Sequence, residues 1–232
     1  MYNTPPSTTP PRAPWWIRLA LVIAGLGLWF LTQSLLATRG DTSVIVDEVL
    51  NWTGPIHGWL AEHRAAANLL LIVSSLGIDL LGVFLLVWSI FGPSIRPFLG
   101  LLMLFALRQL CQATCALPTP PGMLWFQPTL GGWAVPSLLV TYGTSNDFFF
   151  SGHTALAVYG CVELARLGRK PLVLLAAALA VFEMAAVIVL RAHWTMDLYG
   201  GIVTALLAAY LASWLAPACD RWLASLRRSA RA

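Results

Sequence analysis

Two short segments, each with a histidine, contain the residue types best suited to chemistry. The first is Ser151-Gly152-His153-Thr154. Ser151 is a good helix N-cap and Gly152 permits close backbone approach, so we expect His153 in the first turn of a helix. Free N–H groups and the helix dipole favour an anion at that position, which suits a phosphate. On its own, the tetrapeptide fits a capped helix start with an interfacial histidine equally well.

The second segment, Arg191-Ala192-His193-Trp194-Thr195-Met196-Asp197, pairs a histidine with an acid. His193 and Asp197 are four residues apart, which places both on one face if a helix starts near His193. The carboxylate could then orient the imidazole and stabilise its cation. Histidine is a competent nucleophile, and a phosphohistidine would divide a transfer into two steps. Taken alone, the pair is better explained as a hydrogen bond that holds a helix end.

The composition places both segments in a membrane. Hydrophobic residues make up 58% of the 232 residues, charged residues only 10%, and the mean hydropathy is +0.74. Soluble domains are far less apolar. The 14 Lys and Arg residues lie between apolar stretches, which argues against nucleic-acid binding and indicates topology signals. The four cysteines show neither disulfide nor zinc spacing and are expected to be small apolar filler.

Six stretches approach the ~20 apolar residues that a membrane span needs. The sequence therefore predicts an all-α, polytopic bundle of six transmembrane helices. The spans are expected at residues 15–37, 68–91, 95–116, 151–167, 171–191 and 195–215. A disordered tail (residues 1–14) precedes the membrane catalytic domain (residues 15–216), and a basic cytoplasmic tail (residues 217–232) follows it. Two long connections, residues 38–67 and 117–150, are expected to cap one face.

The basic residues predict the orientation. In the six-span arrangement most of them fall on one side, and only Arg39, Arg64 and Arg191 fall on the other. Since positive residues are retained in the cytoplasm, both termini are expected there and the long connections outside. All but one of the 14 basic residues are arginine, which is typical of a GC-rich, bacterial genome. We therefore expect a bacterial inner membrane, with the active site on the periplasmic side.

Three ordered blocks resemble one branch of the type 2 phosphatidic acid phosphatase superfamily, which contains sphingomyelin synthases and plant phosphatidylcholine:diacylglycerol cholinephosphotransferases. The first block is Arg108 with Thr114 and Leu117-Pro118-Thr119-Pro120. The second has Asp147 six positions before His153, and the third is His193-x-Thr-x-Asp197. The similarity covers residues 107–207, the motif core.

The resemblance implies a role for each matching residue. His193 is the nucleophile that attacks the head-group phosphorus, and Asp197 is its orienting partner. His153 is the acid for the departing lipid alkoxide and then the base for the acceptor. The groups implied at the phosphate are Arg108, Arg191, Ser151, Gly152 and Asp147. Because arginines and helix N–H groups can meet the phosphate charge, neither a metal nor another cofactor is implied.

Departures from the phosphatase branch favour transfer over hydrolysis. That branch has a Lys, six residues and Arg-Pro, and an Arg six positions before the nucleophile. Here the sole lysine is Lys170, in an inner loop. The position six before His193 is occupied by Val187 instead of an arginine. Arg191 instead gives the Arg-x-His of the plant cholinephosphotransferases. We expect phosphocholine or a related head group to move from a phospholipid to a lipid alcohol such as diacylglycerol or ceramide.

Two other functions stay open. A lipid phosphate or polyprenyl diphosphate phosphatase would use the same residues with water as acceptor. A membrane scaffold or transporter would use none of them for catalysis.

Charges within the predicted spans suggest a further contact. Arg108, Glu183 and Asp79 each lie roughly 18 to 20 Å from the inner ends of their spans, at ~1.5 Å per residue. Isolated charges in hydrocarbon are costly, so we expect Arg108 to contact Glu183, Asp79 or both. The contact would be either structural or a means by which Glu183 aims Arg108 at phosphate.

The remaining polar and aromatic residues carry simpler expectations. Glu163 and Asp220, near the inner boundary, are expected to be solvated. His57 is expected to be an ordinary polar loop residue. Trp125 and Trp133 are expected in a lipid-facing lid, since tryptophan prefers the bilayer interface.

Overall fold

The computed structural model describes Leu31 and residues 45–115, 117–140, 142 and 149–229. Its contacts divide the chain into two units, Met1–Val46 and Asp47–Ala232. The predicted tail and first span lie outside the described residues, Leu31 excepted. All elements discussed below belong to the second unit.

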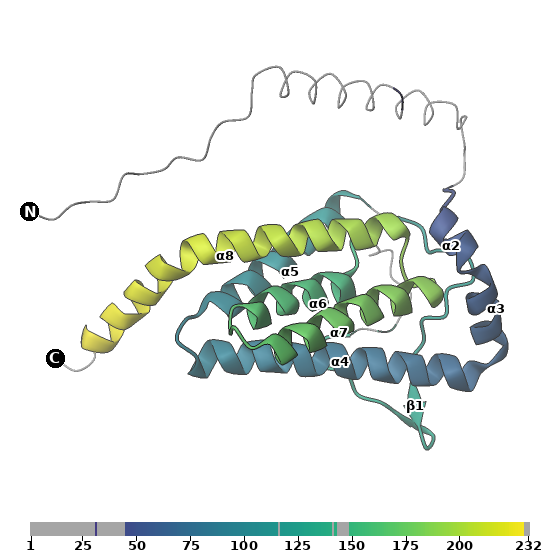
Figure 1. Ribbon diagram of the computed structural model, residues 1–232, viewed down its shortest axis with the longest axis horizontal. Coiled ribbons are helices and arrows are strands. Elements are labelled where there is room, and N and C mark those ends of the chain that lie inside the picture. Colours follow the sequence, from purple (N-terminus) through teal and green to yellow (C-terminus); the bar gives the residue numbers. More distant parts are fainter. Residues whose placement is uncertain (1–30, 32–44, 116, 141, 143–148, 230–232) are drawn as a thin grey trace, which may run out of the picture. The chain divides into compact units, whose positions relative to one another are not determined.

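The second unit is mostly helical (Figure 1). Two short helices, α2 (Glu48–Trp52) and α3 (Gly54–Glu62), come first. The longer ones are α4 (Arg64–Phe91), α5 (Arg96–Thr114), α6 (Gly152–Ala165), α7 (Lys170–Val189) and α8 (Thr195–Ser229). Strands β1 (Thr129–Leu130) and β2 (Trp133–Ala134) form an antiparallel hairpin in which Leu130 pairs with Trp133.

Among the described residues, four helices are long and apolar enough to cross a membrane: Arg64–Phe91, Arg96–Thr114, Lys170–Val189 and Thr195–Leu223. They identify an integral membrane protein and correspond to four predicted spans. A fifth predicted span, residues 151–167, corresponds to α6, which has only 14 residues. At ~1.5 Å per residue α6 is about 21 Å long, shorter than the ~30 Å hydrocarbon core. The last helix continues through residues 217–229, so most of the predicted basic tail is helical.

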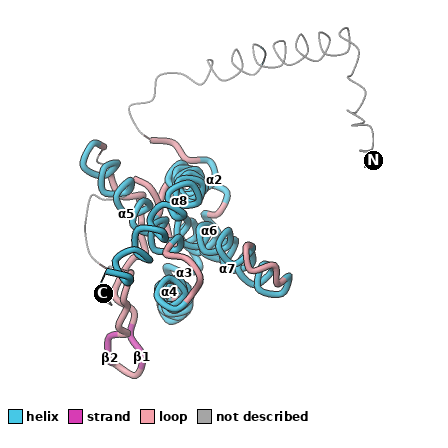
Figure 2. Tube along the Cα trace, turned by 90° about the vertical axis from the view of Figure 1, so that its left-hand side faces the viewer, coloured by secondary structure: helices cyan, strands magenta, loops and turns pink. Residues whose placement is uncertain are grey.

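Helix α6 is the centre of the bundle. It packs against α7, α8, α4 and α5, and it lies between α8 and α4 in both views (Figures 1 and 2). Glycines allow the close approach. A Cβ on Gly160 would lie 2.6 Å from Leu81 on α4, and one on Gly201 would lie 2.9 Å from the Ser151 carbonyl oxygen. Larger residues there would push α4 or α8 away from α6.

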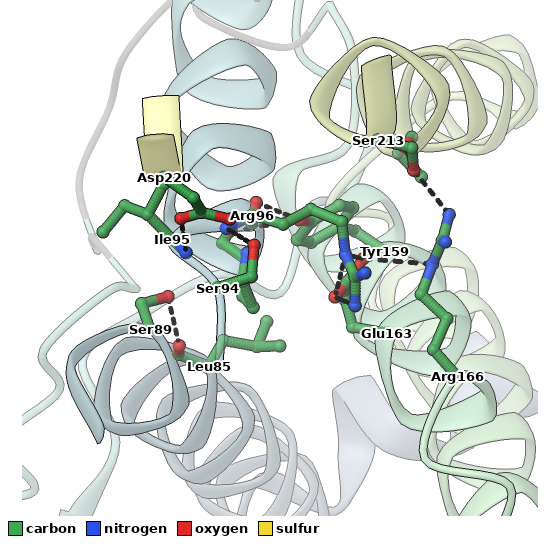
Figure 3. A network of polar contacts seen from close by, with 12 residues as sticks. Leu85, Ser89, Ser94, Ile95, Arg96, Tyr159, Glu163, Arg166, Ser213 and Asp220 are labelled. Atoms are coloured by element: carbon green, nitrogen blue, oxygen red, sulfur yellow. Dashed lines mark hydrogen bonds and ion pairs between the residues drawn. The ribbon is translucent and has the colours of Figure 1, made fainter. Parts of the chain in front are cut away.

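A network of polar contacts surrounds the C-terminal end of α6 (Figure 3). The Arg96 guanidinium donates to both Glu163 carboxylate oxygens, with its Nη2 2.9 Å from Oε2. Arg166 Nε lies 3.4 Å from the other oxygen, and Arg166 Nη2 donates to Ser213. Glu163 is only 4% exposed. The expectation of a solvated Glu163 is wrong, because two arginines from neighbouring helix ends enclose it.

The same network joins α5 to α6 and α8. The Tyr159 hydroxyl donates to the carbonyl oxygens of Arg96 and Pro97, at 3.2 and 3.1 Å. The Asp220 carboxylate accepts from the Ile95 amide at 3.0 Å. Asp220 is therefore bonded to the start of α5 and half-buried, rather than freely solvated.

The connection between α5 and α6 returns across the opposite end of the bundle. Asn68 exchanges two hydrogen bonds with the Thr129 backbone, which ties the hairpin to the start of α4. The Leu124 amide donates to the Leu190 carbonyl at the end of α7. Trp133 is 82% exposed, whereas Trp125 packs among the buried residues of the bundle. The lid expectation therefore does not hold for Trp125.

Candidate active site

The first histidine segment forms the start of α6. The Ser151 side chain accepts a hydrogen bond from the Thr154 amide at 3.3 Å, so the predicted N-cap is confirmed. His153 lies in the first turn and is 8% exposed. Its Nε2 atom is buried and has no hydrogen-bond partner among the described residues. The segment therefore presents an imidazole beside a helix N-terminus, as the sequence predicts.

The second histidine segment leads into α8. His193 Nδ1 lies 3.4 Å from Asp197 Oδ2, which confirms the predicted pair. The helix, however, begins at Thr195 rather than near His193. Asp197 reaches back because its Oδ2 also accepts from the Trp194 amide at 3.0 Å, as an acid in the first turn does when it caps the preceding residue. The contact between His193 and Asp197 is therefore formed by the turn that begins α8, and not by two residues on one face of a helix.

Backbone contacts hold the two segments against each other. The Ser151 amide donates to the Asp197 carbonyl oxygen at 3.0 Å. Gly200 and Gly201 then bring the first turns of α8 against residues 150–155, where a Gly200 Cβ would lie 3.2 Å from Phe150 Cβ. Both the His193 imidazole and the Arg108 charge act electrostatically on His153. Two segments separated by about forty residues thus share one site.

Arg108 extends from α5 to the start of α6. Its Nε donates to the Phe150 carbonyl oxygen at 3.2 Å, and a Cβ on Gly152 would lie 3.3 Å from the same nitrogen. A larger residue at Gly152 would crowd the guanidinium. The structure therefore brings Arg108 to the phosphate-binding end of α6, where the sequence places it.

The expected contact of Arg108 with Glu183 or Asp79 is wrong for the described residues. Glu183 accepts from the Ser74 hydroxyl at 2.6 Å. Asp79 accepts from the Ser137 hydroxyl and the Leu138 and Leu139 amides, each at 2.9 Å. Equal depth sets a residue's height in the bundle but not the direction in which it faces. Helix α5 packs on α8, α4 and α6, while Glu183 faces α4.

Arg191 adopts an unusual backbone conformation at the end of α7. Its φ is +52°, in the left-handed region that favours glycine. The Ala192 amide donates to Val187 and the Arg191 amide to Ile188, which closes α7 with a Schellman-type turn. The guanidinium donates to the Pro121 carbonyl oxygen at 2.8 Å. Arg191 therefore braces the α5–α6 connection beside the site.

Asp47 is a residue of the candidate site that no sequence pattern indicates. Its carboxylate accepts from the Thr195 amide and hydroxyl at 2.7 and 2.8 Å, and from the Val49 and Leu50 amides at 3.1 and 3.2 Å. One side chain thus caps both α2 and α8. Since Thr195 lies between His193 and Asp197, Asp47 fixes the turn that carries this pair.

His57 and Trp125 also lie close to the predicted site residues. The His57 Nδ1–H donates to the Val189 carbonyl oxygen at 2.9 Å, and its ring is buried on α3. The expectation of a loop histidine is therefore wrong. Trp125 stands edge-on to His153, with 5.2 Å between ring centroids. No spacing in the sequence indicates that His57 or Trp125 lies near the site, because tertiary packing brings both of them there.

Buried polar atoms without partners concentrate at this end of the bundle. In the part of the chain that the structure describes they are His153 Nε2, Thr154 Oγ1, Glu183 Oε1, Arg191 Nε and Asp197 Oδ1. Four of the five belong to the two histidine segments. A buried polar group without a partner is costly and rare, so such a cluster favours a site that receives a polar ligand.

The last two features of the predicted site are Asp147 and the question of a metal. Asp147 lies outside the described residues. Among the residues that are described, no three His, Cys, Asp or Glu side chains converge as a metal site would require.

Residues 46–214 match the model of the AtPDCT1/2 family, named for plant phosphatidylcholine:diacylglycerol cholinephosphotransferases. No curated protein and no solved structure matches the chain. The matched range contains both histidine segments and Asp47, and it confirms the resemblance to the plant enzymes. A plant family gives no support to the bacterial inner membrane expected from composition. Because the match covers well over half of its residues, the chain belongs to the AtPDCT1/2 family.

Proposed function

We propose that this protein is a membrane-embedded transferase that moves phosphocholine from a phosphatidylcholine-type donor to a lipid alcohol such as diacylglycerol. The observation that carries the proposal is the joining of His193, Asp197 and His153 at one end of the bundle. The family name supports the same head group and acceptor.

In the first step the donor phosphorus is attacked by His193. Because Asp197 occupies the Nδ1 side of the ring, at 3.4 Å, we assign Nε2 as the nucleophilic nitrogen. The new N–P bond forms as the P–O bond to the donor glycerol breaks. His153 gives that oxygen a proton, so diacylglycerol leaves neutral. Arg108 and the N–H groups at the start of α6 balance the phosphate charge.

In the second step the acceptor hydroxyl attacks the phosphorus and the N–P bond breaks. His153, now neutral, accepts the hydroxyl proton. His193 returns to its starting state, and a new phosphocholine lipid is released. Water in place of the lipid alcohol would make the same protein a phosphatase.

The proposal includes the topology: six spans, with both termini cytoplasmic and the site in the outer leaflet. The span within residues 15–37 would be the first. The basic residues near the inner ends of α5, α6 and α7 support this orientation. Reagent labelling of single cysteines placed at Gly131, in the hairpin, and at Gly168, between α6 and α7, tests it. Only the hairpin cysteine should react from outside intact cells or vesicles of native orientation.

The function is tested with purified protein in mixed vesicles that contain phosphatidylcholine labelled on phosphate. With diacylglycerol present, label should move to new phosphatidylcholine, and His193→Ala should abolish the movement. Acid-labile label on the protein, absent from His193→Ala, should report the phosphohistidine. Abundant free phosphocholine would show a phosphatase instead. Turnover that survives in His193→Ala would overturn the catalytic role of this residue.

A further inference from the structure

Helix α6 separates two sets of side chains with opposite electrostatic character. Arg108 and the His193–Asp197 pair reach the site from α5 and α8. On the side of α4 and α7 the charged side chains beyond the first residues of the helices, Arg64 and Lys170, are acidic: Asp79 and Glu183. The aromatic residues Trp125 and Tyr142, from the connection before α6, lie with this second set.

The Trp125 ring lies directly beside His153, and the Tyr142 ring lies beside Trp125. Trp125 meets His153 edge-on, with 5.2 Å between centroids and 89° between planes. Its ring centroid also lies 5.2 Å from that of Tyr142, at 32°. The Tyr142 hydroxyl is hydrogen-bonded to Ser75, which anchors the ring on α4. A group two carbons away from a phosphate at His153 would be within reach of these rings.

The half-buried carboxylate of Asp79 gives this region negative potential. Both Asp79 and Glu183 act electrostatically on Tyr142, and Asp79 also acts on His153. Neither carboxylate forms an ion pair with any described residue, and the buried Glu183 Oε1 has no partner among them. A charge within an apolar helix is costly unless it is compensated. A bound cation would provide that compensation.

The hydrogen bonds at Asp79 narrow the type of cation. Its oxygens already accept from Ser137, Leu138 and Leu139, so this carboxylate offers charge more readily than a further hydrogen bond. A trimethylammonium has no N–H to donate and is attracted by aromatic rings and by charge at longer range. A primary ammonium would lose its hydrogen bonds to water without direct replacement from Asp79.

We propose that Trp125 and Tyr142, supported by the charge of Asp79, bind the quaternary ammonium of the donor head group. The phosphate of the same head group lies toward His153 and His193. This assignment rests on the proposed function, and it makes Trp125 and Tyr142 specificity-determining residues that favour choline over ethanolamine.

The test compares phosphatidylcholine with a neutral isostere in which 3,3-dimethylbutanol replaces choline. The two donors match in shape and differ in the ammonium charge. Wild-type protein should prefer phosphatidylcholine by roughly tenfold in kcat/KM, the scale of a desolvated cation–π contact. Trp125→Leu should bring the ratio near one, and Trp125→Phe should give an intermediate ratio. Trp214→Leu, at an exposed tryptophan of α8, is the control and should keep the wild-type ratio.

Trp125 packs against all three buried hydrophobic clusters, so Trp125→Leu can fail to fold. Asp79→Asn provides a second route, because it removes charge with little change of shape and should lower the ratio several-fold. A ratio near one in wild type, or an unchanged ratio in both Trp125→Phe and Asp79→Asn, would overturn the assignment while leaving phosphocholine transfer intact.

Binding measured without turnover separates the two proposals. Calorimetry of the wild-type protein with soluble phosphocholine and with 3,3-dimethylbutyl phosphate should show roughly tenfold tighter binding of phosphocholine. If that preference is found but no lipid is turned over, the proposed function fails and the ammonium site stands. Equal binding of the two compounds would reject the ammonium site.

Discussion

The two ends of α6 treat polar groups in opposite ways. Near its last turn, both oxygens of the buried Glu163 are bonded by arginines, and the Tyr159 hydroxyl reaches two carbonyl oxygens. At its first turn, buried atoms of His153 and Thr154 have no partner among the described residues. One end is a network of bonded polar groups that joins helices, whereas the other holds buried polar atoms that no described residue satisfies. Stability and chemistry are therefore expected to respond to different substitutions.

The largest effect is expected from His193→Ala, at the site beside the first turn of α6. Loss of the proposed nucleophile should lower phosphocholine transfer by at least roughly a thousandfold, because the proposed two-step route would be lost. Thermal unfolding in detergent should change little, since the bond between the Trp194 amide and Asp197 remains. His63→Ala, at an exposed histidine stacked on Trp59, is the matched control and should keep wild-type turnover. Equal loss in both variants would contradict the assignment.

At the last turn of α6, Arg96→Met should lower the stability of the fold. It leaves the buried Glu163 with only the longer Arg166 contact, and breaking a buried pair costs about 3 kcal/mol. Chemical unfolding should measure this loss, while transfer per folded molecule stays near wild type. The double variant Arg96→Met with Glu163→Leu should recover much of the loss, because no unpaired charge then remains buried. A double variant less stable than the single one would refute the explanation.

Substitutions of Asp47 test whether the geometry of the His193–Asp197 turn depends on the hydrogen bonds that Asp47 accepts. In Asp47→Asn the charge at Thr195 is lost, so we expect kcat to fall roughly tenfold, as a small displacement of the His193–Asp197 turn would cause. KM should change less, because Asp47 is not assigned to substrate. Asp47→Ala should be worse and also less stable by about 1 kcal/mol, the usual value of an N-cap. Parallel changes of kcat and stability across both variants would indicate a structural role only.

The smallest effect is expected at Arg191, where the two variants should differ in stability but should both lose turnover. Arg191→Gly removes a side chain from a residue with φ of +52°, whereas Arg191→Ala removes the guanidinium but keeps a Cβ there. The glycine variant should be about 1 kcal/mol more stable than the alanine variant. Both should turn over lipid more slowly than wild type, since both lose the bond to Pro121. Chemical unfolding and kcat measured side by side check both statements.

Local features of both regions could be predicted from the sequence. Ser151 as N-cap, the His193–Asp197 contact and four membrane-spanning helices follow from capping preference, short spacing and apolar length. Features that depend on helix packing could not. Asp47 and Thr195 are 148 residues apart, and no pattern links them. Arg108, Asp79 and Glu183 lie at similar depth, but depth does not determine which helices become neighbours.

The short length of α6 has a consequence for water, which would compete with the lipid alcohol as the acceptor. With the inner end of α6 level with the inner edge of the hydrocarbon, its first turn lies about 21 Å higher, roughly a third of the ~30 Å core below the outer edge. A lipid alcohol reaches that depth by diffusing sideways within the leaflet. Water must leave the bulk phase to get there. In the proposed topology, a phosphorus atom at that depth would meet hydroxyl groups of lipids far more often than water, which would protect the proposed intermediate from hydrolysis.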